Sequence, residues 1–344
     1  MFKSFYRLAG ATAVVSGLLG AVAQAASAPP PPVSTNGNPV QLVASGLKGP
    51  TSFAFGDGSV FEGDSGNSSS GPPNGGVYVL KDGAGVEIPA SPLFVGGMTF
   101  HDGALYLSGA FLVNGAPSWQ LDKWSGWNGT TFTKRTAIYT APKKFQGFNG
   151  LAFGADGRIY VGVDTGLLDN NDHGPASLSP YLYDILSIGA NGKGLKVFAS
   201  GMRQPWQMAF PAGSNSPYVS DFGQDSGAKN PPDFLLRVAA GQNYGFPKCN
   251  WTKSAACKGF AKPFKQFSPH TDVGGVVIVG KRLYMSEFGF APKLHPPAVV
   301  SLPLSGKGAA KTIVHFSTPV IALAAEGNWL YIGTVTGQVF RIKV

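Results

Sequence analysis

Charged residues are scarce in this 344-residue chain, because Asp, Glu, Lys and Arg together make up only 13% of it. The usual share is about 25%. Helices exposed to solvent depend on Glu, Lys and Arg as well as on Ala and Leu, so this composition argues against a helix bundle, a coiled coil or a helical solenoid. The net charge is +9, but no run of Lys or Arg and no basic helix pattern is present, which argues against nucleic acid as a partner. The positive excess fits either simple solubility or an anionic ligand.

Cysteine is almost absent, with two residues in the whole chain. Cys249 and Cys257 lie eight positions apart. In an oxidising compartment such a pair forms one disulfide that closes a local loop. Two thiols with no His beside them make a poor zinc site, so the sequence predicts a structural role for both.

Long apolar runs are missing except at the start of the chain. Lys3 and Arg7 precede an apolar stretch of small residues, and Ala-x-Ala sites end at Ala25 and Ala28. This pattern is typical of a secretory signal peptide over residues 1–28. The apolar run is shorter than the ~20 residues that span a bilayer. We therefore expect an exported protein, periplasmic or secreted, with no transmembrane segment after the signal is removed.

Glycine and proline are abundant instead. The 48 Gly and 27 Pro residues make up about 22% of the chain, against roughly 12% in average proteins. The chain is also 43% hydrophobic and 12% aromatic, which is enough to bury a core and argues against disorder. With helical and disordered classes excluded, the composition is typical of many short strands joined by tight turns. It therefore predicts an all-β sandwich, barrel or propeller.

A repeat refines this prediction. An apolar strand, a Gly-rich turn and a second strand centred on an aromatic residue recur six times, which is typical of β-hairpins. The copies read SFAFGDGSVFEGD, MTFHDGALYLSG, LAFGADGRIYVGVD, MAFPAGSNSPYVSD, VVIVGKRLYMSE and LAAEGNWLYIGT. Their central aromatic residues, spaced 45 to 66 positions apart, are Phe61, Tyr106, Tyr160, Tyr218, Tyr284 and Tyr331. A period near fifty indicates propeller blades.

A third strand follows every copy, and a fourth follows five of them. The sixth copy reaches the end of the sequence, but PVQLVASG near the start resembles the outer strand LKVFASG of the third copy. We therefore predict an all-β, six-bladed propeller over residues 39–344, with the N-terminal strand completing the last blade. Residues 29–38 are expected to form a Pro-rich linker.

In this architecture, the connections between second and third strands and those between blades open on one face around the central channel. We expect long loops on that face, including one over residues 109–119, and short Gly turns on the other. Function is expected where the loops are long. His101 and His315 are expected on the surface elsewhere. The face gathers polar side chains, among them His173, His270, His295, Arg203, Lys293, Asp164, Asp172, Asp221, Asp225, Asp272, Glu287 and Gln224.

Three ordered segments within residues 199–247 carry a more specific signal: ASGMRQPWQMAF, VSDFGQD and PPDFLLRVAAGQNYGFP. They resemble the soluble quinoprotein glucose/sorbosone dehydrogenase family, whose members carry Gly-x-Arg-Asn-Pro, Asp-x-Gly-x-Asp and Asn-Tyr-Gly-Trp-Pro in this order. GLAFGADGRIYVGVD and SPHTDVGG resemble neighbouring parts of that family. The likeness covers roughly residues 39–344 and is strongest in the middle.

The resemblance implies a six-bladed propeller that uses pyrroloquinoline quinone (PQQ) to oxidise a small sugar, an aldose, to its lactone and passes electrons to an external acceptor. PQQ is a planar tricarboxylate, for which bidentate guanidinium is a natural partner. Arg203 occupies the matching position, beside Gln204, where the family has Asn. Trp206 offers a ring for stacking. Gln224 and Lys293 complete the cofactor-binding set that the resemblance implies.

Calcium supports the family's site and requires oxygen ligands. Asp225, Asp233 and Tyr244 match by position. The family has an acidic pair where this chain has Asp233 followed by Phe234, so one carboxylate is lost.

The catalytic base is the main point at which this sequence departs from the family's pattern. In the family, a His takes the anomeric hydroxyl proton, but here Gln146 stands at that position, and glutamine cannot accept a proton at neutral pH. His270, His173 or His295 could reach the same point from another blade. Alternatively, the chain is a non-catalytic propeller that binds a sugar, a polymer or a protein.

A calcium-dependent lactonase or esterase is a third possibility. Such an enzyme needs carboxylate and amide groups that converge on the channel axis. Asn149, Asp164, Asp221 and Glu287 are its candidates.

Overall fold

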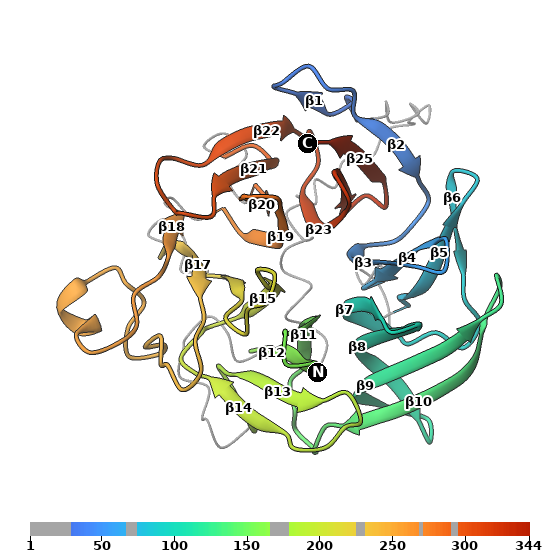
Figure 1. Ribbon diagram of the computed structural model, residues 1–344, viewed down its shortest axis with the longest axis horizontal. Helices are drawn as coiled ribbons and strands as arrows, with labels where there is room; N and C mark the ends of the chain where they lie inside the picture. The colour runs from blue at the N-terminus through green and yellow to red at the C-terminus, as the bar shows by residue number, and fades with distance from the viewer. Residues whose placement is uncertain (1–28, 67–73, 166–178, 225–230, 268–270, 290–294) are drawn as a thin grey trace, which may run out of the picture.

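The computed structural model describes residues 29–66, 74–165, 179–224, 231–267, 271–289 and 295–344. Six antiparallel sheets surround a central axis (Figure 1). The predicted all-β class and the six blades are confirmed. Within these residues, the only helical segment is a single 3₁₀ turn at Ser254–Cys257.

Each blade is built from consecutive strands that run from the channel to the rim. The first three blades are β3 (Pro50–Gly56), β4 (Ser59–Asp64), β5 (Gly76–Lys81), β6 (Ala84–Glu87); β7 (Phe94–His101), β8 (Ala104–Val113), β9 (Ala116–Trp127), β10 (Phe132–Thr140); and β11 (Phe148–Phe153), β12 (Arg158–Val163), β13 (Ile185–Gly189), β14 (Lys196–Ala199). The others are β15 (Pro205–Ala209), β16 (Tyr218–Asp221), β17 (Asp233–Arg237), β18 (Lys265–Phe267); β19 (Val273–Val279), β20 (Arg282–Glu287), β21 (Ala298–Pro303), β22 (Lys311–His315); and β23 (Val320–Glu326), β24 (Trp329–Thr334), β25 (Val339–Lys343).

The outer strand of blade 6 comes from the other end of the described chain. β2 (Gln41–Ala44) pairs antiparallel with β25, and Gln41 lies opposite Arg341. Figure 1 shows this strand in blue beside the red C-terminal blade. Upstream, β1 (Val33–Ser34) pairs with β22 and adds a fifth strand to the rim of blade 5. Residues 33–44 therefore contact two neighbouring blades.

The repeated aromatic residues hold the ring together. Each of the six is at most 6% exposed and belongs to a different apolar cluster between two adjacent blades. Phe61, for example, packs between blades 1 and 2 against Trp127 and Phe132. The period of the sequence repeat is therefore the period of the blade interfaces, and buried aromatic side chains contribute strongly to such packing.

Serine hydroxyl groups add hydrogen bonds between blades. Ser108, Ser220 and Ser286 occupy second strands. Each donates to a carbonyl oxygen on the innermost strand of the next blade, over 3.1 Å to Gly150, 2.5 Å to Gly274 and 2.9 Å to Ile321. A buried hydroxyl group without a partner would be costly. These bonds therefore favour one relative position of each pair of neighbouring blades.

Two loop predictions were wrong. Residues 109–119 do not form a loop, since β8 and β9 pair continuously up to Val113 and Ala116 around the turn Asn114–Gly115. We call the face with the connections between second and third strands the mouth face, and the opposite one the turn face. Connections that begin on the turn face are not all short, because residues 238–264 separate β17 from β18.

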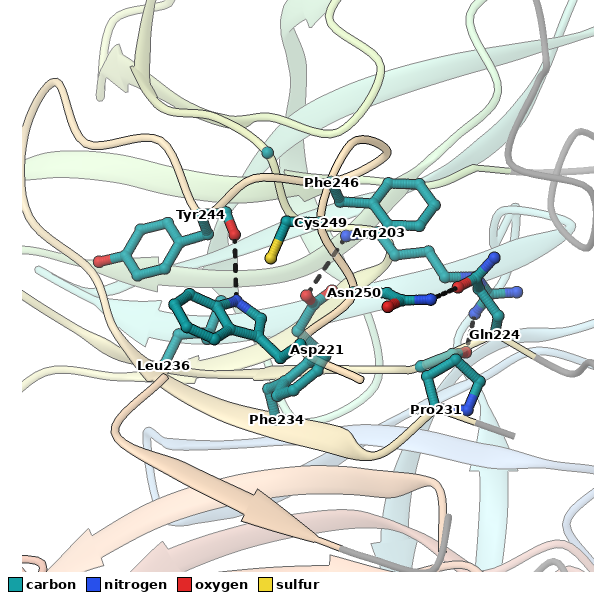
Figure 2. A pocket seen from close by; sticks show the side chains of 13 residues that line it. Arg203, Asp221, Gln224, Pro231, Phe234, Leu236, Tyr244, Phe246, Cys249 and Asn250 are labelled. Atoms are coloured by element: carbon teal, nitrogen blue, oxygen red, sulfur yellow. Dashed lines mark hydrogen bonds between the residues drawn. The ribbon is translucent and has the colours of Figure 1, made fainter. Parts of the chain in front are cut away.

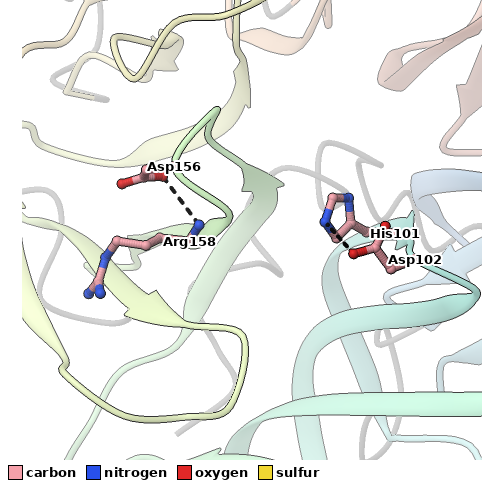
Figure 3. Close-up of polar contacts among 4 residues, drawn as sticks. All are labelled: His101, Asp102, Asp156 and Arg158. Carbon is pink, nitrogen blue, oxygen red and sulfur yellow. Dashed lines mark hydrogen bonds and ion pairs between the residues drawn. The ribbon is translucent and has the colours of Figure 1, made fainter.

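The turn-face connections between β7 and β8 and between β11 and β12 match the expectation of tight turns. Asp156 accepts a hydrogen bond from the backbone N–H of Arg158 over 3.2 Å (Figure 3). His101 Nε2 lies 3.4 Å from Asp102 Oδ2, and its ring stacks on Phe153 with centroids 3.9 Å apart. His101 is therefore remote from the mouth face, as predicted. His315 is exposed on β22.

Among the described residues, the Gln207 side chain reaches across the central channel. Gln207, on the innermost strand of blade 4, donates from Nε2 to the carbonyl oxygen atoms of Thr51 in blade 1 (3.4 Å) and Gly96 in blade 2 (3.2 Å). Toward the turn face, the innermost strands of all six blades line a cavity of about 310 Å³. Its lining combines polar atoms with apolar side chains, among them Phe55 and Phe100.

Candidate functional site

The three sequence segments that carry the family resemblance come together in blade 4. The connection after β17 turns back along the interblade loop, where the Tyr244 N–H donates to the Ser200 carbonyl over 2.9 Å and the Phe246 N–H donates to that of Gly201 over 3.0 Å. Figure 2 shows their side chains around one pocket. Its cavity volume is about 10 Å³, roughly enough for one water molecule. This junction is a packed unit and holds no space for a larger ligand.

Gly201 is required by this packing. Its φ of 75° favours glycine. A Cβ there would clash with Asn243 Oδ1 and would lie 2.6 Å from the backbone nitrogen of Gly245. The Gly of the Gly-x-Arg motif thus lets two chain segments approach closely, and it holds Arg203 two residues further on.

Arg203 is a preorganised cation. Its side chain is only 3% exposed. One terminal nitrogen donates to the carbonyl oxygen atoms of Phe222 (3.3 Å) and Gly223, and Gln204 Oε1 lies 3.5 Å from the same nitrogen. The backbone that carries β16 into its loop therefore fixes the direction of the guanidinium group.

The other cofactor candidates pack nearby. Trp206 is fully buried and stacks on Phe222, with ring centroids 5.4 Å apart and an interplanar angle of 23°. Both rings belong to an apolar cluster with Phe288 and Ile321. These positions lie at the mouth-face ends of strands in blades 4, 5 and 6. Gln224 Oε1 accepts a 2.8 Å hydrogen bond from Asn250 (Figure 2).

Acidic residues at the ends of second strands have a repeated structural role. Asp64 lies opposite Pro50, and Asp221 lies opposite Pro205. Each aspartate accepts hydrogen bonds from the two backbone N–H groups that precede its proline. The distances are 2.8 and 3.0 Å from Lys48 and Gly49, and 3.3 and 2.7 Å from Arg203 and Gln204. These carboxyl groups hold the interblade loops in place.

Glu287 occupies the same position in blade 5, opposite Val273. The two preceding N–H groups, those of Thr271 and Asp272, donate instead to Asp233 Oδ2, each over 2.7 Å. Within the described residues, no hydrogen bond to the Glu287 side chain is found. Glu287 is half-buried, and its carboxyl group is therefore released from the role that Asp64 and Asp221 perform.

The electrostatic setting of Glu287 suits proton transfer near neutral pH. Burial, together with the nearby Asp233 carboxylate, raises the pKa of Glu287 to about 7. Burial also raises the pKa of Asp221 to about 7, although the backbone N–H of Gln204 and the Arg203 cation act in the opposite direction. A general base is most effective when its pKa lies near the working pH. From the sequence, Glu287 was one of several polar residues of this face and a lactonase candidate, and nothing there indicated a raised pKa.

The expected calcium ligands are used otherwise. Asp233 is fully buried, and besides the two bonds above its Oδ1 accepts from the Gly223 N–H over 2.8 Å. The Tyr244 hydroxyl donates to the Arg237 carbonyl over 2.6 Å. Asp225 lies outside the described residues. In the described part of the chain, no group of three or more His, Cys, Asp and Glu side chains is placed to hold a metal ion.

Gln146, which stands where the related family has its catalytic His, is half-buried. Gln146 Nε2 donates to the Lys144 carbonyl over 3.1 Å. Nearby, Asn149 is fully buried at the mouth-face end of β11, and neither of its amide atoms has a hydrogen-bond partner among the described residues. His270, Lys293, His173 and Asp172 lie outside the described residues, and His295 is half-buried after the last gap.

The predicted disulfide between Cys249 and Cys257 is confirmed. It closes a loop next to the motif junction, whose pocket Cys249 helps to line. Replacing both cysteines with Ser is expected to lower the free energy of unfolding by about 2–3 kcal/mol, because the unfolded chain gains freedom. Urea unfolding at pH 7 measures this loss. Reduction of the wild-type protein should give the same shift, and an unchanged midpoint in both experiments would contradict a stabilising role.

The fold is shared with several solved structures. A protein from Thermus thermophilus described as an oxidoreductase (glucose dehydrogenase) superposes with a TM-score of 0.68 at 17% identity, covering 89% of this chain and 100% of that one. The PQQ domain of pyranose dehydrogenase from Coprinopsis cinerea gives 0.67 at 14% identity, covering 91% and 97%. A protein described as a gluconolactonase gives 0.61 at 14% identity, covering 89% and 92%.

At these identities, the likeness shows a shared fold. No protein-family model and no curated protein sequence matches the chain. Among the described residues, no helix is both long and apolar enough to cross a membrane.

Proposed function

We propose that the chain is an exported enzyme that oxidises the anomeric hydroxyl group of an aldose to the lactone, with PQQ bound on the mouth face near blades 4 and 5. The observation that carries the proposal is Glu287, a carboxyl group without structural hydrogen bonds among the described residues, at a position where blades 1 and 4 use an aspartate to support a loop. The fold it shares with a glucose dehydrogenase and a PQQ domain supports the same class of chemistry.

Arg203 and Gln204 fit recognition of one carboxylate of the cofactor, whose ring system would lie outside the packed junction. The Arg203 guanidinium is directed by two carbonyl groups and lies beside Gln204, which suits recognition of a carboxylate. Trp206 does not offer the stacking face that the resemblance implied, because it is fully buried against Phe222 and its ring has no exposed side. Because the pKa of Asp221 is raised to about 7, that carboxyl group carries less than a full negative charge near neutrality. Arg203 and Gln204 would hold a cofactor carboxylate, and the bound quinone would supply the hydride acceptor.

Glu287 would perform the proton transfer. Its carboxylate would take the proton of the anomeric hydroxyl group as the C1–H bond breaks, which is the role that the resemblance gives to a histidine. Gln146 can donate to or accept from a substrate hydroxyl group but cannot take its proton. A base supplied by blade 5 would therefore replace one lost from blade 3.

Arg203→Ala is expected to abolish PQQ binding, since the variant lacks the only described cation of the resemblance motif. Isothermal titration calorimetry of the purified protein with PQQ measures this effect directly. Lys48→Ala is the matched control, because Lys48 precedes Pro50 as Arg203 precedes Pro205 and donates to the Asn74 carbonyl over 2.7 Å. Unchanged binding in Arg203→Ala would place the cofactor elsewhere.

The reaction itself is tested by dye reduction with aldoses after reconstitution with PQQ, with and without calcium. Turnover supports the proposal. Cofactor binding without turnover on a broad aldose panel would favour a non-catalytic binding protein. Absence of PQQ binding by the wild-type protein would refute the proposal.

A lactonase is the second candidate, and Asn149 favours it. A buried amide with neither atom paired among the described residues is costly, and such a group at the end of a channel suits an ion or a polar ligand. The fold likeness to a gluconolactonase agrees with this interpretation. Hydrolysis of aldonolactones without quinone, abolished by Asn149→Leu, would select this function over the first.

A further inference from the structure

The connection between β17 and β18 is strongly basic. Residues 238–267 contain five lysines and no acidic residue. Lys248, Lys253, Lys258 and Lys262 are exposed, as are Lys307 in the adjoining turn of blade 5 and Lys311 at the start of β22. We call these six side chains the lysine rim. Residues 295–315 also lack any acidic residue, so no carboxylate within either segment offsets this charge.

The lysine rim stands on a rigid base. The Cys249–Cys257 disulfide closes its central loop, and Trp251 Nε1 donates to the Tyr244 carbonyl over 3.3 Å. Phe264 packs edge-on against Tyr218, with centroids 4.9 Å apart. Lys265 donates to the Gly308 carbonyl over 3.3 Å and so joins this loop to the turn that carries Lys307. The backbone that carries these lysines is therefore held in place, which lowers the entropy lost when a partner docks.

This loop is also joined to the candidate site. Asn250, between Lys248 and Lys253, donates to Gln224. The Tyr244 N–H bonds to Ser200, three residues before Arg203. Figure 1 shows the loop as an orange projection at the rim of blade 4. A partner on the lysine rim would therefore lie beside the blade that carries the Arg203 motif.

We propose that the lysine rim is the docking surface for an acidic one-electron carrier protein. The inference rests on the proposed function, which requires an external electron acceptor. Oxidation of the aldose breaks its C1–H and anomeric O–H bonds, forms the C1=O double bond of the lactone and releases two electrons and two protons. Each of two carrier molecules takes one electron, and both protons pass to water, the first by way of Glu287.

The absence of exposed apolar groups favours a protein over a lipid surface. The exposed large apolar side chains of the described chain are Val33, Leu42, Val86, Leu112, Val113 and Val197. None lies in the described parts of residues 238–267 or 295–315. Surface binding to membranes combines basic charge with apolar insertion, whereas brief electron-transfer complexes are small and are formed by electrostatic steering.

Charge reversal tests the proposal. The reconstituted enzyme, its triple variant Lys253→Glu, Lys258→Glu, Lys262→Glu and a matched control, Lys81→Glu, Lys134→Glu, Lys196→Glu, are reduced with aldose. Stopped-flow spectroscopy then follows electron transfer to an acidic blue-copper protein and to a basic c-type cytochrome in low and in near-physiological salt. We expect the triple variant to react at least ~10-fold more slowly with the acidic carrier in low salt, while the control variant and the rate with a small neutral dye stay unchanged.

Binding is measured separately, by fluorescence titration of each protein with the acidic carrier, so that docking is tested even if turnover fails. Loss of binding in the triple variant alone supports the proposal. Equal binding by the triple and control variants would overturn it. Binding to phosphatidylglycerol vesicles but not to the acidic carrier would overturn it in favour of a membrane surface. Failure of dye reduction with carrier binding intact would count against the proposed function and leave the docking surface standing.

Discussion

Replacing Glu287 with Gln is expected to lower kcat/KM for aldose oxidation by about 10²–10⁴-fold, the usual effect of losing a positioned general base. Glutamine keeps the size of the side chain and removes its ability to take a proton. Dye-coupled kinetics with the reconstituted protein measure the effect. The matched control is Glu326→Gln, an exposed glutamate at the end of β23, which should retain full activity.

The pH profile gives a second readout of the same group. Glu287 acts as a base only when deprotonated, and its pKa is raised to about 7. In the wild-type protein, kcat/KM should therefore rise with pH through about 7 and then level off. The residual activity of Glu287→Gln should lack this rise. A profile that is identical in both proteins would exclude Glu287 as the base.

Stability should move in the opposite direction to activity. Because the folded state raises the pKa of Glu287 above its ordinary value of about 4.3, folding favours the protonated form, and the stability it contributes is lost as pH rises through about 7. Glutamine avoids this loss, so Glu287→Gln should have the higher Tm at pH 8. A variant that was both inactive and less stable would indicate a structural role instead.

Asp233→Ala is expected to reduce the free energy of unfolding by about 3 kcal/mol or more. The fully buried carboxylate accepts from the backbone N–H groups of Gly223, Thr271 and Asp272. Removing it leaves three buried donors unpaired, each costing about 1–3 kcal/mol. Urea unfolding in the presence of EDTA measures the loss, with the exposed Glu326→Ala as control.

The same experiment separates a structural Asp233 from a calcium ligand. Our expectation is an equal loss with and without calcium, because the described bonds already occupy the carboxylate. Asp233→Asn should fall between Ala and the wild type, since an amide keeps one acceptor oxygen. A loss that appears only when calcium is present would restore the ligand role that the resemblance implied.

The ring of blades could be predicted from sequence because its determinants are local and repeated. Phe61 and Tyr331 stand at equivalent positions in their hairpins, and both are buried at blade interfaces. The continuous pairing of β8 with β9 in blade 2, where a loop was expected, also has a local sequence signal. Asn114–Gly115 is the sequence of a two-residue hairpin turn, and it predicts the continuous pairing of β8 with β9.

The candidate site was predictable only in part, because its chemistry depends on contacts between distant segments. Arg203 could be located from its motif. The absence of loop-supporting hydrogen bonds at Glu287 could not be predicted, because Glu287 has the same position in the repeat as Asp64 and Asp221. The difference arises when Asp233, from the preceding blade, takes the N–H groups of Thr271 and Asp272. Likewise, residues 238–264 begin on the turn face, and only their bonds to Ser200 and Gly201 bring them back to the site.

The Gln207 side chain lies between the turn-face cavity and the mouth face. Its bonds to Thr51 and Gly96 hold a polar side chain at the cavity of about 310 Å³, which Gln207 helps to line. A small solute that enters through the turn face meets this side chain before it can approach Glu287. We therefore expect reactants and products to enter and leave by the mouth face, where the long loops lie.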